Sequence, residues 1–369
     1  MDMIIHSFRL AFAICLALVL GSCATAPSGT GGAAIERGFV LRSLTLDDTV
    51  EDRILALDPD HISGQDVHST LAAGPTPRII LLHGSVYPDF LIMTSFANFL
   101  EGMGYPEAKL RDPLDGAYSQ SPYGNTERIA GEVAWYYEHD GVRPLMIGHS
   151  LGGMQAVKVL YELAGDFTHK VNVWNARIDR PEKRFTIVDP LTGVERPVVG
   201  LSVAYASAIA AGGAAFILPN QWDMLSRLHK IPNTVDEFTG YAIRGDLIAW
   251  SFAGISSASN YRAAGVATVR NVVLPVTYNH ITVPITHGLA EDQRTRDWIN
   301  AYVPHDSSEV VVPADVATFN ILWAADVWFS IKKHWCLEAQ RLIRAKRAAS
   351  PLPIRPNNPS RDESALLGR

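Results

Sequence analysis

Cysteine is scarce in this sequence of 369 residues, with Cys15, Cys23 and Cys336 as its only examples. Two of the three fall within the first 23 residues, which leaves Cys336 without a partner in the rest of the chain. This count excludes a framework of intrachain disulfides and a metal site built from cysteines. We therefore predict that Cys336 is a small, buried apolar side chain.

A strong excess of positive or negative charge is also lacking. The chain carries 32 Lys and Arg against 38 Asp and Glu, and no basic stripe runs through its central region. Such a balance argues against a nucleic-acid partner. The sequence contains no His-Glu-x-x-His motif, no paired Cys-x-x-Cys and no Gly-Lys-Ser/Thr loop, so we predict neither a metal nor a nucleotide cofactor. With 47% hydrophobic and 19% charged residues, the composition is typical of a globular protein.

Residues 1–22 have the order of a secretory signal peptide. Arg9 precedes an apolar stretch over residues 10–20, and two small residues follow that stretch. The stretch is shorter than the roughly 20 residues that a membrane-spanning helix needs. We therefore expect this segment to be a targeting sequence that is removed from the mature protein.

The motif Leu20-Gly21-Ser22-Cys23 resembles the lipobox of bacterial lipoproteins. The resemblance implies that Cys23 becomes a lipid-modified N-terminus and anchors the chain in a membrane. Ala24 follows the cysteine, which in Gram-negative lipoproteins implies transfer to the outer membrane, facing the periplasm. Residues 23–45 then form a flexible tether. The alternative is an ordinary secretory signal with an incidental Cys23, and hence a secreted protein.

Short apolar runs alternate with helical patterns in the domain that we expect to span residues 46–305. Ile79–Leu82 and Pro144–Ile147 have the length and composition of buried parallel strands. Apolar residues recur at helical spacing around these runs. Three later strand candidates are Val198–Ala206, Phe238–Arg244 and Val272–Leu274. The alternation predicts an α/β fold with a mainly parallel sheet and helices on both faces.

The second apolar run leads into Gly148-His149-Ser150-Leu151-Gly152-Gly153, which contains the pattern Gly-x-Ser-x-Gly. In a strand-to-helix turn of this kind, the glycines leave room for neighbouring backbone and the serine hydroxyl is exposed at a helix N-terminus. Here an apolar strand precedes the motif and an amphipathic helix follows it. We predict that Ser150 is a nucleophile and that His149 packs beside it without acting as a base.

Acyl transfer at such a serine creates a negatively charged oxygen, which two backbone N–H groups usually receive. The first candidate is the N–H of Leu151, the residue after the nucleophile. The second is the N–H of Ser85, because His83-Gly84-Ser85 follows the first predicted strand. A simple strand-ending turn is the alternative interpretation of this second segment.

A serine nucleophile needs a histidine that takes its proton and an acid that orients the histidine. Asp246 and His280 lie just after the last two predicted strands, where such sites collect. We predict that these two residues complete a Ser-His-Asp triad with Ser150. The competing acids are Asp189, Asp223 and Asp236, and the competing histidines are His287, His305 and His334.

At these motifs the chain resembles the α/β-hydrolase superfamily, and more narrowly the small secreted bacterial lipases and esterases. The resemblance covers about residues 75–302 and implies hydrolysis of a small-molecule or lipid ester through an acyl-enzyme. An acyltransferase, thioesterase or amidase with the same triad is one alternative. A non-catalytic, membrane-tethered binding protein on a hydrolase fold is another.

Two segments depart from that resemblance. Residues 166–236 mix charged and Ala/Gly-rich stretches, and we expect them to supply one core strand and a cap insertion. Residues 306–369 form a C-terminal extension, with one long helix over 315–347 and a disordered tail over 350–369. The helix has an apolar stripe and a basic end, so it either packs on the protein body, which we favour, or lies on an anionic membrane surface.

Overall fold

The computed structural model describes residue 41 and residues 44–85, 87–211, 219–249, 260–304 and 312–349. All of these belong to one compact unit. The predicted signal peptide, the anchor Cys23, most of the tether, His305 and the tail from residue 350 lie outside the described residues.

Six parallel strands form the central sheet, in the order β12-β10-β8-β3-β1-β2. Their bounds are β1 Ile79–Leu82, β2 Ser119–Gln120, β3 Leu145–His149, β8 Val203–Ile209, β10 Val235–Ile243 and β12 Thr268–Leu274. The α/β class and the parallel sheet are therefore as the sequence predicts. Parallel strands need long crossover connections, and helices provide several of them.

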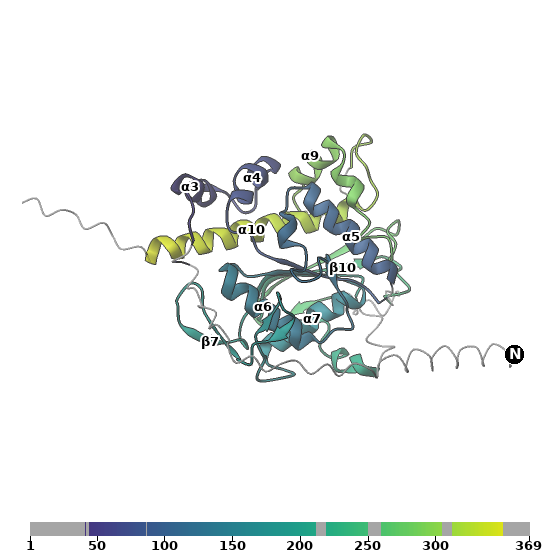
Figure 1. Cartoon of the computed structure of the whole chain (residues 1–369). Helices are drawn as coiled ribbons and strands as arrows, with labels where there is room; N and C mark the ends of the chain where they lie inside the picture. The colour runs from purple at the N-terminus through teal and green to yellow at the C-terminus, as the bar shows by residue number, and fades with distance from the viewer. Residues whose placement is uncertain are drawn as a thin grey trace, which may run out of the picture. The chain divides into compact units, whose positions relative to one another are not determined.

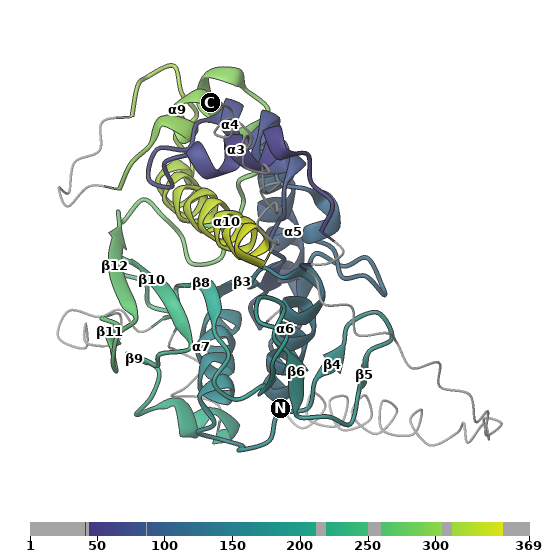
Figure 2. The same ribbon diagram turned by 90° about the vertical axis from the view of Figure 1, so that its left-hand side faces the viewer.

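Helices cover both faces of the sheet (Figures 1 and 2). The strands alternate between the two layers: Ile79 and Leu81 of β1 belong to one buried apolar cluster, and Ile80 and Leu82 belong to the other. Helices α5 (Tyr87–Gly102) and α10 (Ile321–Ala349) pack in the first cluster, and α6 (Thr126–Asp140) and α7 (Leu151–Ala164) pack in the second. The shorter helices are α3 (Asp48–Ala56), α4 (Gly64–Ser69) and α9 (Gln293–Ala301).

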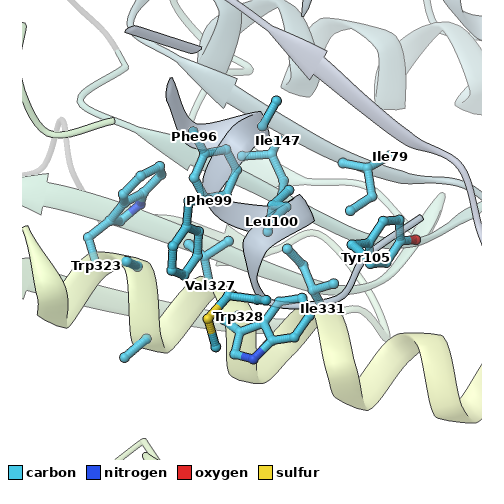
Figure 3. Close-up of a cluster of buried hydrophobic side chains, with 14 of the residues drawn as sticks. Ile79, Phe96, Phe99, Leu100, Tyr105, Ile147, Trp323, Val327, Trp328 and Ile331 are labelled. Carbon is cyan, nitrogen blue, oxygen red and sulfur yellow. The ribbon is translucent and has the colours of Figure 1, made fainter. Parts of the chain in front are cut away.

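Helix α10 is part of the core. Figure 3 shows Trp323 and Trp328 of α10 among side chains of α5, β1 and β3, and both tryptophans are fully buried. The basic end of the helix is partnered within the chain, because Lys346 and Arg347 pair with Glu51 of α3. The stripe thus packs on the protein body as favoured, and the membrane-surface alternative is wrong for this helix. The described residues before and after position 305 belong to the same compact unit.

The segment 166–236 supplies a core strand, as expected, but its boundary is displaced. Strand β8 begins at Val203 rather than at Val198, because the N–H of Val198 donates to the carbonyl oxygen of Phe185 in a neighbouring loop. Gly200 then adopts a φ of +95° in the turn before the strand.

Two antiparallel hairpins precede β8 in the same segment. They pair β4 (Trp174–Asn175) with β5 (Arg180–Pro181) and β6 (Thr186–Val188) with β7 (Glu195–Pro197). The second hairpin packs on the C-terminal end of α6, where the N–H of Val188 donates to Glu138 at 2.7 Å. That end of α6 leads into the start of β3, so this hairpin lies at the amino edge of the sheet. Residues 212–218, where a cap is also expected, lie outside the described residues.

The other described elements are the 3-10 helices η1 (Leu71–Ala73), η2 (Glu107–Lys109), η3 (Pro219–Met224) and η5 (His287–Ala290), and the short parallel pair of β9 (Lys230–Ile231) and β11 (Arg262–Ala263). Among the described residues, no helix is both long and apolar enough to cross a membrane. The same part of the chain holds no group of three or more His, Cys, Asp or Glu placed to bind a metal ion.

Candidate active site

The order of the strands reverses beside β1, at the carboxyl edge of which the predicted site residues lie. Strand β1 pairs with β2 on one side and with β3 on the other, so the chain reverses its direction of progress at this point. Connections that leave neighbouring strands in opposite directions create the crevice in which open α/β sheets bind ligands. His83-Gly84-Ser85 follows β1 and Ser150 follows β3, so both predicted segments lie at this position.

Ser150 sits in a strained turn between β3 and α7. Its φ of 53° and ψ of −120° are rare for a residue with a side chain. The turn is held because the N–H of Ser150 donates to the carbonyl oxygen of Ile209 at 2.9 Å. A Cβ on Gly148 would lie 2.2 Å from the carbonyl oxygen of Gly152, and a Cβ on Gly152 would lie 2.3 Å from that of Leu82. Both glycines are therefore required by close backbone approach.

Hydrogen bonds connect the three predicted triad residues in series. The Nε2 atom of His280 lies 3.0 Å from the Oγ of Ser150, and the Nδ1 atom of the same ring lies 2.7 Å from Oδ2 of Asp246. The other oxygen of Asp246 accepts from the N–H groups of Ile248 and Ala249, at 2.9 and 3.0 Å. His280 and Asp246 are both buried, whereas Ser150 is only partly buried. The structure thus brings together side chains from three separate strand ends.

The surroundings of Asp246 keep its carboxyl group ionised. Burial raises its pKa, but the hydrogen bond and charge of His280 and the two backbone N–H donors lower it by more, so the pKa falls below its usual value. An ionised carboxylate can only accept hydrogen bonds, so Nδ1 of His280 must be the protonated ring nitrogen. Nε2 is then free to accept the hydroxyl proton of Ser150.

The competing acids all have other partners. Asp189 accepts from Tyr137 and from the backbone of its own turn, Asp223 pairs with Lys158, and Asp236 pairs with Arg143.

Two of the competing histidines are also engaged elsewhere. His287 bonds to Ser95, and His334 bonds to Glu237. The third, His305, lies outside the described residues.

The two predicted oxyanion donors lie on adjacent strand ends. Leu82 of β1 is in register with Gly148 of β3, so the loop after β1 runs beside the turn that carries Ser150. Leu151 begins α7, and among the described residues neither its N–H nor that of Ser85 donates to an acceptor. The hydroxyl of Tyr123 donates to the carbonyl oxygen of Ser85 at 2.9 Å and thereby restrains this loop.

His149, which the sequence predicts to pack beside the serine, also bonds to the loop that carries His280. Its ring points toward the loop of the base, and its Nε2 donates to the backbone carbonyl oxygen of His280 at 2.8 Å. The side chain is fully buried, and burial together with the nearby His280 lowers its pKa to about 4. The sequence gives no signal for this contact, because it joins residues that are far apart in the chain.

Comparisons with known proteins say little about this site. No protein-family model matches the sequence, and no curated protein matches it. Ten chains of solved structures match, among them one described as RedJ with a PEG molecule bound in the active site. It is 13% identical, the match covers 63% of this chain and 92% of that one, and the TM-score is 0.25. A score this low does not establish a shared fold, so the α/β class rests on the strand pairing given above.

Proposed function

We propose that this chain is a serine hydrolase of the α/β-hydrolase fold that cleaves carboxylic esters. The observation that carries the proposal is the bonded series from Ser150 through His280 to Asp246, with the serine in a strained turn at the point where the strand order reverses. A turn with positive φ at a non-glycine residue is costly, and such strain collects at functional sites. A purely structural serine gains nothing from this placement.

The proposed reaction follows from the atoms in place. Ser150 Oγ attacks the ester carbonyl carbon while Nε2 of His280 takes the hydroxyl proton. The C–O bond to the alcohol breaks, His280 returns the proton to the leaving oxygen, and an acyl-enzyme remains. Water then attacks the acyl carbon by the same route and releases the acid. Asp246 stabilises the imidazolium of His280 at each step.

Negative charge develops on the carbonyl oxygen during both attacks. We assign its stabilisation to the N–H groups of Leu151 and Ser85, which lie on neighbouring strand ends and have no acceptor among the described residues. Leu151 also begins α7, so the positive end of the helix dipole favours an anion there.

Apolar side chains on the same loops support an ester with apolar groups as the substrate. Leu247 and Ile248 follow Asp246 directly, and Ile281 follows His280. All three are exposed, at 64%, 54% and 41%. Exposed apolar groups beside a polar site are a common feature of small-molecule binding.

Activity toward p-nitrophenyl esters from acetate to palmitate tests the proposal, with the parent protein lacking residues 1–23 beside Ser150→Ala. Ser69→Ala, at the exposed C-terminal end of α4, is the matched control. We expect turnover by the parent and the control and its near-complete loss in Ser150→Ala. The chain-length profile then separates an esterase from a lipase.

Labelling by a fluorophosphonate gives a second readout. If Ser150 is labelled while no ester is cleaved, the nucleophile is competent and another acyl substrate is indicated, such as a thioester or an amide. If folded parent protein shows neither labelling nor turnover, the hydrolase proposal is wrong and the non-catalytic alternative becomes the better one.

We also propose that Cys23 carries the lipid anchor and that the domain works at the outer membrane. The support is the sequence motif alone. Full-length protein expressed in a Gram-negative host should partition with membranes, and Cys23→Ala should release it from them. Equal partitioning of the two forms would contradict the anchor.

A further inference from the structure

A histidine directly before the strained turn contacts the loop that carries His280, the proposed base. His149 is the last residue of β3, immediately before Ser150, and its Nε2 lies 2.8 Å from the backbone carbonyl oxygen of His280. We propose that His149 is a positioning residue, which fixes the backbone of His280 to the strand that carries the nucleophile. The inference rests on the proposed serine chemistry and adds to it a residue outside the triad.

The protonation of the ring follows from its partner. A carbonyl oxygen only accepts hydrogen bonds, so Nε2 of His149 must carry the proton and Nδ1 must be bare. Nδ1 is buried and has no hydrogen-bond partner within the described part of the chain. An unpaired buried nitrogen destabilises the folded state. An apolar ring of similar size would fill the same space without this cost, so simple packing does not account for a histidine here.

Other restraints on the loop of His280 include bonds from the start of α10 and from Asn320 just before it. The N–H of Leu322 donates to the hydroxyl of Tyr278 at 2.9 Å, and the amide of Asn320 donates to the carbonyl oxygens of Thr282 and Ile285 at 2.7 and 3.1 Å. These bonds place the loop relative to α10 but not relative to Ser150. Among the described residues, His149 supplies a backbone-directed bond between this loop and β3, the strand that leads to Ser150.

The position of this bond suits the chemistry of the pair. The Oγ of Ser150 and Nε2 of His280 are 3.0 Å apart, and proton transfer between them requires that separation to be kept within a narrow range. The bond from His149 acts on the backbone of His280 itself, so it limits movement of the imidazole away from the serine. The two rings lie 5.4 Å apart, and burial keeps the ring of His149 neutral, so no second positive charge opposes the imidazolium of His280.

Three substitutions separate positioning from packing. His149→Phe keeps an aromatic ring but removes the donor, and we expect kcat for a p-nitrophenyl ester to fall by about 10- to 100-fold with KM changed less than about threefold. His149→Gln places an amide N–H near the position of Nε2 and should restore most of that loss. His149→Asn is too short to reach the carbonyl oxygen and should resemble the Phe variant.

The matched control is His139→Phe. His139 is an exposed histidine of α6 that bonds to a carbonyl oxygen within its own helix, so its replacement should leave kcat unchanged. Melting temperatures of all variants identify any that fail to fold. If His149→Phe does not fold, the comparison of Asn with Gln still tests the proposal.

The rate of labelling by a fluorophosphonate is measured beside turnover, because it depends on the serine and histidine but not on the choice of ester. Loss of labelling rate in the Phe and Asn variants with recovery in Gln supports positioning, even if the parent cleaves none of the esters. Equal rates in the folded Phe, Asn and Gln variants and the parent would overturn it, and equal losses in all three would reduce His149 to a packing residue. A parent that is neither labelled nor active would instead refute the hydrolase proposal itself.

Discussion

Replacing Asp246 by asparagine should invert the hydrogen bond that orients His280. One carboxylate oxygen of Asp246 accepts from two backbone N–H groups at 2.9 and 3.0 Å, so the Oδ1 of an asparagine must stay in that place. The amide nitrogen is then directed at Nδ1 of His280, 2.7 Å away. The opposite orientation would bring the amide N–H groups against the two backbone donors. Asp246→Asn therefore has one favourable orientation, and in it the side chain donates.

A donor at this position forces His280 into the wrong tautomer. Nδ1 must become the acceptor, and the ring proton moves to Nε2, which then cannot accept the hydroxyl proton of Ser150. In a serine protease the same exchange lowers kcat about 10⁴-fold with the geometry intact. We expect a loss of the same order here, which corresponds to about 5 kcal/mol of transition-state stabilisation.

Steady-state kinetics with a p-nitrophenyl ester measure this loss, and a melting curve checks that the fold is kept. Asp236→Asn is the matched control, because Asp236 is a half-exposed carboxylate that pairs with Arg143 at the amino edge of the sheet. It should change kcat by less than about twofold. A kcat for folded Asp246→Asn above about one hundredth of the parent value would refute this assignment of the acid.

Three further perturbations address the turn, an ion pair and the core. Gly152→Ala places a Cβ 2.3 Å from backbone oxygen, and we expect at least about a 100-fold loss of activity with about 1–3 kcal/mol of destabilisation. Burial alone would raise the pKa of Glu237, but the adjacent His334 and Lys333 outweigh burial and lower the pKa to about 2. The charge of Glu237 therefore stabilises the fold by on the order of 3 kcal/mol. That contribution is complete above about pH 4.5 and is lost as the pH falls toward 2, so parent and Glu237→Gln should converge in unfolding free energy over this range. Trp328→Ala should destabilise the protein by about 3–5 kcal/mol, because the side chain is fully buried in α10.

Each of these three has its own contrary outcome, and the first and the third have a matched control variant. Gly288→Ala meets no atom within 4 Å and should be neutral, so equal effects at the two glycines would contradict the steric argument. A pH-independent difference between parent and Glu237→Gln, measured by urea unfolding, would show that the charge is not the source of stability. Leu337→Ala, at a partly exposed position of α10, should cost under about 1 kcal/mol, and a similarly small cost for Trp328→Ala would mean that α10 is not part of the core.

The sequence predicts the edge of the sheet at which the site lies better than it predicts the element boundaries. Strand β1 occupies Ile79–Leu82, as the apolar run indicates, because four consecutive buried residues leave little choice of register. Parallel strands end at the same edge, so residues just after three of them converge without any long-range information. For this reason Ser150, Asp246 and His280 could be selected from their positions relative to predicted strands.

The orientation of His149 could not be predicted in the same way. The pattern Gly-x-Ser-x-Gly fixes the backbone of the turn, but the direction of the side chain before the serine depends on the loop that reaches it from elsewhere in the fold. That loop is specified 131 residues later in the chain. Local periodicity carries no information about such a pairing.

The long C-terminal helix posed a different difficulty, because an apolar stripe with a basic end fits both a membrane surface and a protein core. The structure decides between them through polar partners as well as apolar ones. Asp326, in the N-terminal part of α10, is buried and accepts from the hydroxyl of Tyr241 and the guanidinium of Arg270. A buried carboxylate with two such donors is paired within the protein, as expected for a helix that packs in a core.

That same carboxylate connects α10 to the acid and the base. Tyr241 belongs to β10, which ends just before Asp246, and Arg270 belongs to β12, which leads to the loop of His280. The two strands are already paired in the sheet, and Asp326 adds a side-chain bond from one helix to each of them. The start of α10 then restrains the loop of His280 directly, through Leu322 and Asn320. A helix that lies outside the recognisable motifs therefore supports the strands and the loop that carry the two residues which the proposed chemistry requires to act as a pair.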